Sequence, residues 1–192
     1  MKFLAPIGLT LLLVGCGASP KTQFYTLDPV APHQDQAARP MGVKVQVAAV
    51  HIPAALDRQE MVRESAPNKL DVSDQNRWGA PFGDMIRRVL TQDLTQRLGP
   101  AAVDLPEGPA PQADKIVIDI LQFSSGPTGL VTFDGSCSLI RPGSAAAFAN
   151  FHVHLSENGQ PGDYGTDAAA MSRIIGQLAD EIVAALHTAA KG

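Results

Sequence analysis

The segment from Pro81 to Leu98 constrains the fold most, because its apolar residues form a single stripe along a helix. These residues recur at the i, i+3, i+4 spacing that brings side chains to one helical face: Phe82, Met85, Ile86, Val89, Leu90, Leu94 and Leu98. Pro81 suits the first helical position, and Gly99-Pro100 ends the helix. A helix with one apolar stripe must lie against a sheet or another helix. Four charged residues are expected to lie mainly away from the stripe: Arg87, Arg88, Asp93 and Arg97.

A second amphipathic helix is predicted from about Thr166, with six apolar residues on one side: Met171, Ile174, Ile175, Leu178, Ile182 and Leu186. Three strands are predicted between the two helices, over residues 115–123, 131–139 and 147–155. The first is apolar on both faces except at Asp119, which is typical of a central strand buried on both sides. The other two alternate between apolar and polar residues, which indicates one buried face each.

The N-terminal half supplies further strands. Residues 43–49 alternate around Val45 and Val47, and Pro53 ends that strand. Residues 61–64 and 69–72 are weaker strand candidates that could form a hairpin at Pro67-Asn68, and residues 24–27 could add a short strand. The pattern predicts an α+β fold: a two-layer sandwich in which a mixed, mostly antiparallel sheet carries two amphipathic helices on one face.

The first sixteen residues indicate export. Lys2 precedes an apolar run, residues 3–14, that is shorter than the ~20 residues needed to span a bilayer and typical of a secretory signal peptide. The run ends in Leu13-Val14-Gly15-Cys16, which resembles the bacterial lipobox. That resemblance implies cleavage before Cys16 and its lipidation; an ordinary signal peptide cut elsewhere, or a core helix, is the alternative. We therefore expect a signal peptide over 1–15, a lipidated, Pro-rich tether over 16–41 and one α/β domain over 42–190.

Composition and motifs bound the function. The net charge of −4 argues against a nucleic-acid partner, which would need a basic surface. No phosphate loop, dinucleotide fingerprint or nucleophile elbow is present, so we predict no cofactor and nominate no catalytic residue. His152 and His154 share a strand face, but two ligands do not make a metal site, and we expect both in solvent. Cys137 is expected as a small buried hydrophobe rather than a reactive thiol.

Three residues near the first helix are candidate partner contacts: Arg58, Arg77 and Trp78. Trp and Arg are enriched at interface hot spots, and Trp78 is the only tryptophan. The alternative is that Trp78 packs over the edge of the core.

Taken together, several segments resemble the auxiliary lipoproteins of the paraquat-inducible protein C type. They are Tyr25-Thr26-Leu27 after the lipobox, Val50-His51-Ile52-Pro53-Ala54-Ala55-Leu56-Asp57-Arg58, Asn76-Arg77-Trp78-Gly79-Ala80-Pro81, and Arg88-Val89-Leu90. Tyr164 and the closing helix are also similar, so the resemblance covers nearly all of the chain after Cys16. Gly79-Ala80 and Phe82 depart from the Ala-Glu and Leu associated with those positions.

This resemblance implies a non-catalytic auxiliary subunit of an MCE-type intermembrane lipid transport system. Its partners would be an MCE-domain bridging protein and inner-membrane transporter subunits, and a ring of identical subunits is one arrangement it allows. Gly17 in place of Asp implies, by the sorting behaviour of enteric-type bacteria, the periplasmic inner leaflet of the outer membrane. Two alternatives remain open: an interaction module of another envelope machine, serving cell-wall synthesis or outer-membrane assembly, and a lipid-anchored periplasmic hydrolase.

Overall fold

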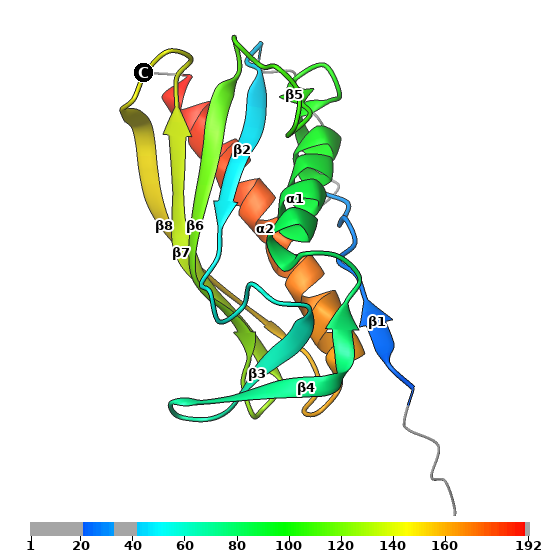
Figure 1. Cartoon of the computed structure of the whole chain (residues 1–192). Coiled ribbons are helices and arrows are strands. Elements are labelled where there is room, and N and C mark those ends of the chain that lie inside the picture. Colours follow the sequence, from blue (N-terminus) through cyan, green and yellow to red (C-terminus); the bar gives the residue numbers. More distant parts are fainter. Residues whose placement is uncertain (1–20, 33–41, 191–192) are drawn as a thin grey trace, which may run out of the picture.

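The computed structural model describes residues 21–32 and 42–190 (Figure 1). Within them the elements follow in the order β1 (Gln23–Tyr25), β2 (Val45–His51), β3 (Glu60–Ala66), β4 (Lys69–Trp78), α1 (Phe82–Leu98), β5 (Val103–Asp104), β6 (Asp114–Ser125), β7 (Leu130–Ile140), β8 (Ala147–Asn158) and α2 (Tyr164–Ala189).

Strand β6 is the centre of one eight-stranded sheet. Along one side it pairs antiparallel with β7, which in turn pairs antiparallel with β8. Along the other side it pairs in parallel with β2 near its start and meets β3 near its end, where Arg63 lies opposite Ser125. Strand β2 carries β5, while β3 carries β4 and then β1. The antiparallel ladders are the longest, so the predicted mixed and mostly antiparallel sheet is confirmed.

Both helices pack on the same face of the sheet, which confirms the predicted two-layer α+β architecture (Figure 1). The apolar stripe of α1 is buried along its whole length, and Gly99 ends the helix with a φ of 91°. Helix α2 begins where the Asp163 side chain accepts hydrogen bonds from the backbone N–H groups of Gly165 and Thr166, at 2.8 and 3.2 Å. This cap satisfies donors that have no partner within the helix.

The prediction that β6 is buried on both faces is wrong. Ile116, Ile118 and Ile120 lie in the core, but Val117 is only half-buried and Leu121 is exposed. The physical reason is that both helices cover the same face, and no described element covers the other. The apolar residues on the outer face of β6 therefore form part of the surface.

The hairpin predicted around Pro67-Asn68 is present and longer than expected, since β3 and β4 extend well beyond the short apolar runs. Asn68 occupies the turn with a φ of 61°, a left-handed conformation that Asn tolerates better than most residues. The far end of β4 pairs in parallel with β1, so residues near the N-terminus join the sheet beside Trp78.

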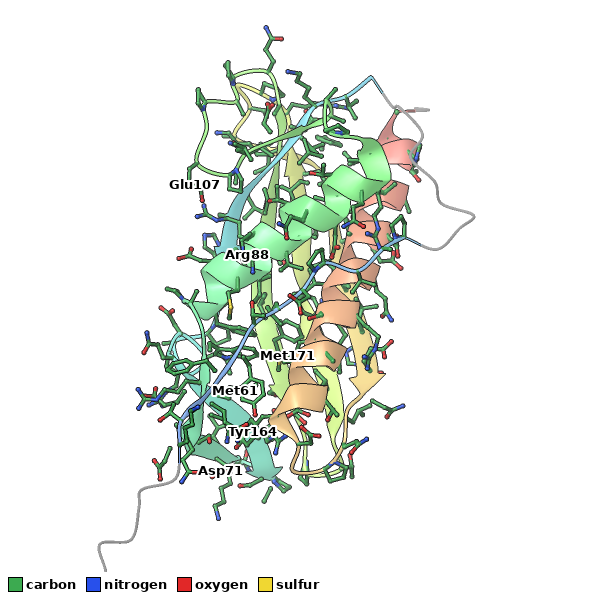
Figure 2. All side chains as sticks on the ribbon, turned by 90° about the vertical axis from the view of Figure 1, so that its right-hand side faces the viewer. Met61, Asp71, Arg88, Glu107, Tyr164 and Met171 are labelled. Atoms are coloured by element: carbon green, nitrogen blue, oxygen red, sulfur yellow. The ribbon has the colours of Figure 1, made fainter. Side chains whose placement is uncertain are left out.

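The prediction that Asp93 and Arg97 lie mainly away from the apolar stripe of α1 is wrong. Asp93 is four residues after Val89 and Arg97 is three residues after Leu94, so both share the buried face of the helix. Both side chains are buried. The segment that follows β1, residues 26–32, passes over the two helices and covers them (Figure 2). Neither α1 nor α2 holds a run of residues long and apolar enough to cross a membrane.

Candidate functional site

The predicted lipidation residue, Cys16, lies outside the described residues, so its lipidation stays a prediction. The nearest described residue is Lys21, two residues before β1.

Residues 26–32 form a segment that we call the strap. Side chains of α1 and α2 form four hydrogen bonds with its backbone. Arg88 Nη2 donates to the carbonyl of Leu27 (3.3 Å), and Ser172 Oγ accepts from the N–H of Asp28 (3.1 Å). At Val30, Asp93 Oδ1 accepts from the N–H (2.7 Å) and Arg97 Nη1 donates to the carbonyl (3.2 Å). Leu27 is fully buried. The strap is therefore fixed to both helices by its backbone groups as well as by its side chains.

Beneath the strap lies a buried ion cluster. Arg97 pairs with Asp180 of α2 at 2.6 Å and lies 3.9 Å from Asp93. Asp93 Oδ2 has no hydrogen-bond partner. Burial raises the pKa of Asp93 to about 6, despite the opposing effects of the Val30 N–H and Arg97. This cluster ties α1, α2 and the strap together, which is a structural role.

The predicted contact residues Arg58 and Arg77 are brought together by Glu60. Arg58 Nε lies 3.2 Å and Arg77 Nη2 lies 3.6 Å from carboxylate oxygens of Glu60. Hydrogen bonding to the backbone of Glu60 itself, and then to Arg58, holds the pKa of the Glu60 carboxyl below its usual value. Arg58 and Arg77 are both partly exposed, so this corner presents two guanidinium groups to solvent around one carboxylate.

Trp78, next to Arg77, is buried in the core, which is the alternative that the sequence left open. Its ring stacks on Phe82 with centroids 4.7 Å apart and an interplanar angle of 15°. The backbone N–H of Trp78 donates to the carbonyl of Gln59 at 2.7 Å. Trp78 adjoins Arg77 in the sequence and its partner Gln59 adjoins Glu60, so the buried Trp78 fixes the backbone that carries the Arg58–Glu60–Arg77 corner.

Two shallow grooves flank the start of α1, and sequence reasoning missed both. One, of about 490 Å³, lies between the end of β2 and α1 and is lined by His51, Asp57 and Arg87 among others. The second, of about 440 Å³, lies between α1 and the loop after β5, where Arg87 Nη2 bonds Glu107 Oε1 at 3.1 Å. No local sequence pattern predicts these grooves, because each is lined by segments that are far apart in the sequence.

His152 and His154 lie on the outer sheet face, exposed as expected. The antiparallel register places Asp134 of β7 beside them, 3.4 Å from His152 Nε2 and 3.0 Å from His154 Nδ1. The hydrogen bond with His154 holds the pKa of Asp134 below its usual value. A similar pair, His51 with Asp119 at 2.7 Å, lies on the same face.

Within residues 21–32 and 42–190, no group of three or more His, Cys, Asp or Glu side chains is arranged to hold a metal ion. Cys137 lies buried on the inner face of β7. Burial, with a smaller effect from Asp119, raises the pKa of its thiol to about 12. At neutral pH the thiol is therefore protonated and shielded, a state that opposes nucleophilic chemistry.

The fold and the surface describe one class of protein, a small two-layer α+β domain with ion pairs and open grooves on its surface. Residues 25–183 match the family model of the ABC-type transport auxiliary lipoprotein component, and the chain belongs to that family. No curated protein sequence matches the chain.

Two solved structures are similar in fold. An uncharacterized protein shares 16% sequence identity with a TM-score of 0.68, over 85% of this chain and 97% of its own. Protein XCC0632 from Xanthomonas campestris, described under the family model DUF330, shares 18% identity with a TM-score of 0.68, over 84% of this chain and 92% of its own. At these identities the likeness shows the fold alone.

Proposed function

We propose that the chain is a periplasmic lipoprotein, anchored by lipid on Cys16 to the inner leaflet of the outer membrane, that serves an MCE-type intermembrane lipid transport system. The observation that carries this proposal is the family match over residues 25–183 to a transport auxiliary lipoprotein component. The Val14-Gly15-Cys16 sequence after an apolar run supports the anchor. On this proposal residues 1–15 are the signal peptide and residues 16–41 lead from the membrane to the domain.

The mechanism we propose is binding and positioning rather than covalent chemistry. The domain would hold an MCE-domain bridging protein near the outer membrane, in a system completed by inner-membrane transporter subunits. The Arg58–Glu60–Arg77 corner supports this role, because two partly exposed guanidinium groups share one carboxylate. Guanidinium groups in such a position suit carboxylates on a partner surface.

The anchor is tested by replacing Cys16. Cys16→Ala should give an uncleaved or soluble periplasmic product, because the residue that carries the acyl chains is gone. Membrane fractionation of cells measures this outcome, and Cys137→Ala is the matched control because it removes the other cysteine. Unchanged membrane fractionation of Cys16→Ala would refute lipidation.

The partner is tested by affinity capture with an MCE-domain protein of the same organism. Arg58→Glu and Arg77→Glu should reduce capture about tenfold or more, as expected for charge reversal at a contact. Arg173→Glu is the matched control: Arg58 and Arg173 have the same side-chain exposure, 42%, and each pairs with one glutamate, but Arg173 lies on α2. Capture of a cell-wall synthase or an outer-membrane assembly factor in place of the MCE protein would favour the alternative envelope machine.

A lipid-anchored hydrolase has one supporting observation, the two histidines that share Asp134. In the register of the sheet Ser136 lies opposite His152, which places a hydroxyl, an imidazole and a carboxylate on neighbouring positions. Both imidazoles are open to solvent, whereas acyl transfer depends on a site that excludes water. A hydrolase screen of the wild type, His152→Ala and His154→Ala decides the matter, since activity lost with either change would establish an enzyme.

A further inference from the structure

The chain leaves the domain toward Cys16 at one end of the molecule. Strand β1, the β3–β4 hairpin and the β6–β7 turn gather at this end, which we call the anchor-proximal end (Figure 1). The loop after β5, the β7–β8 turn and the end of α2 gather at the opposite end. The long strands β6, β7 and β8 separate the two ends.

Chain length limits how far the anchor-proximal end can be from Cys16. Five residues lead from Cys16 to Lys21, and an extended chain advances ~3.3–3.6 Å per residue, so the reach is at most ~18 Å. Strand β6 alone has 12 residues, which at ~3.3 Å each span ~40 Å. A lipid chain on Cys16 would therefore hold the anchor-proximal end near the bilayer, with the opposite end pointing away.

Five large apolar side chains are exposed in the described residues: three belong to the anchor-proximal end, one belongs to the opposite end, and Leu121 lies between the ends on the outer face of β6. Phe24 in β1 is 67% exposed, Leu70 beside the hairpin turn is 48% exposed, and Leu130 at the start of β7 is 41% exposed. These three belong to segments of the anchor-proximal end. Leu105, at 73%, belongs to the loop after β5 at the opposite end. Large exposed apolar side chains gain free energy when a membrane interface removes them from water.

We propose that the anchor-proximal end rests on the membrane surface, with Phe24, Leu70 and Leu130 entering the headgroup region. This proposal rests on the proposed lipidation of Cys16, and it adds a second, non-covalent contact and a fixed orientation. In the sequence Lys21 lies three residues before Phe24 and Lys69 precedes Leu70, and lysine side chains suit the headgroup layer of anionic lipids. Asp71, at the same end in Figure 2, carries the opposite charge. In this orientation the loop after β5 faces away from the membrane.

The experiment measures the depth of single labels on the lipidated full-length protein after signal-peptide removal. Phe24→Cys and Leu105→Cys are labelled with the same fluorophore and bound to vesicles of phosphatidylcholine and phosphatidylglycerol that carry a headgroup-attached nitroxide quencher. Leu105 is the matched control, because its exposure is close to that of Phe24. Cys137 is buried with its pKa raised to about 12, so it does not compete for the label. Lys69→Cys is a second reporter that leaves all three apolar residues in place.

Quenching at positions 24 and 69 should exceed quenching at position 105 several-fold. Equal quenching at all three positions, or stronger quenching at 105, in protein that floats with the vesicles overturns the orientation and leaves the anchor intact. Protein that fails to float with the vesicles overturns the anchor and with it the orientation. Labels at 24 and 69 that are unquenched by lipid but protected by added MCE protein would assign this end to a protein partner and overturn the membrane contact.

Discussion

Asp93 is a buried carboxyl group with one satisfied oxygen. Oδ1 accepts from the Val30 N–H, while Oδ2 has no partner, and the neighbouring charges are Arg97 and Asp180. Because water cannot solvate this carboxylate, its neutral form is favoured and its pKa rises from 3.8 to about 6. The folded protein therefore binds a proton at Asp93 over a pH range in which the unfolded chain does not.

The unfolding free energy should fall as the pH rises from about 4 to about 6, since the folded state there holds more protons at Asp93 than the unfolded state. A shift of this size corresponds to about 2–3 kcal/mol, lost in full above pH 7. Asp93→Asn keeps an acceptor for Val30 and removes the titration, so its stability should vary less over this range. Urea denaturation of both proteins at pH 4, 5, 6 and 7 measures the difference. Parallel pH profiles for the two proteins would show that Asp93 does not titrate as described.

Residue patterns predicted the environment of some side chains and not of others. Cys137 and its neighbours on β7 alternate strictly, so their burial followed from the sequence. Asp93 and Arg97 were predicted to lie mainly away from the apolar stripe, but both lie within the buried face of α1. Their burial depends on the strap, which lies more than sixty residues earlier in the chain. A local pattern carries no information about such a cover.

At the scale of elements, the contact between α1 and α2 is organised by Arg97. Its guanidinium bonds Asp180, the carbonyl of Gly176 on α2, the carbonyl of Asp93 on its own helix and the carbonyl of Val30 in the strap. One side chain therefore links three segments. Removing it would leave the buried carboxylates without their cation.

Arg97→Ala should lower the unfolding free energy by about 3–5 kcal/mol, the usual cost of breaking a buried ion pair from one side. Arg87→Ala is the control on the same helix, since Arg87 pairs with Glu107 and Asp84 at the surface, and it should cost less than about 1 kcal/mol. Equilibrium denaturation gives both values. Similar losses for the two variants would mean that the cluster under the strap contributes no more than a surface pair.

The attachment of the strap to Asp93 and Arg97 leads to a prediction about local proteolysis. Loss of Arg97 should increase proteolytic cleavage within residues 26–32, because two of its four backbone attachments depend on the Asp93–Arg97 pair. Limited proteolysis of Arg97→Ala and Arg87→Ala, followed by mass spectrometry, locates the cleavage. Cleavage of the strap at the wild-type rate in Arg97→Ala would place its stability in the other contacts.

The elements that sequence predicted best are those with a strong local period. Helix α1 begins and ends within one residue of the prediction, because Pro81, the apolar stripe and Gly99 all act locally. Strand β4 was predicted too short, since residues 73–77 are all polar and carry no alternation. The parallel pairing of β1 with β4, and the meeting of His152 and His154 with Asp134, are set by register between distant segments. Spacing along a single strand could place the two histidines on one face but could not supply their carboxylate.

For the whole molecule, Cys137 reports on global unfolding. It lies in the central sheet, in contact with the single core shared by both helices. A thiol reagent at pH 8 should therefore modify the native protein more slowly than the unfolded chain by a factor of at least about 10³, the range of folding equilibrium constants of small domains. Mass spectrometry over time gives the rate, and Arg97→Ala should speed the reaction by the factor by which it raises the unfolding equilibrium constant. Rapid labelling of the stable wild type would show that β7 opens without the rest of the sheet.

Strand β1 is the first element of the domain that a pulling force on the N-terminal chain would reach. Any tension that arrives along the chain from the side of Cys16 first loads β1, whose three residues are joined to β4. If β1 detaches, the load passes to the four attachments of the strap, first to those on Leu27 and Asp28 and then to the two on Val30. The molecule thus has two breakable links in series ahead of its core. On the proposed anchoring, a drag force between membrane and partner would lengthen the tether in two steps, while the sheet other than β1 and both helices stay folded.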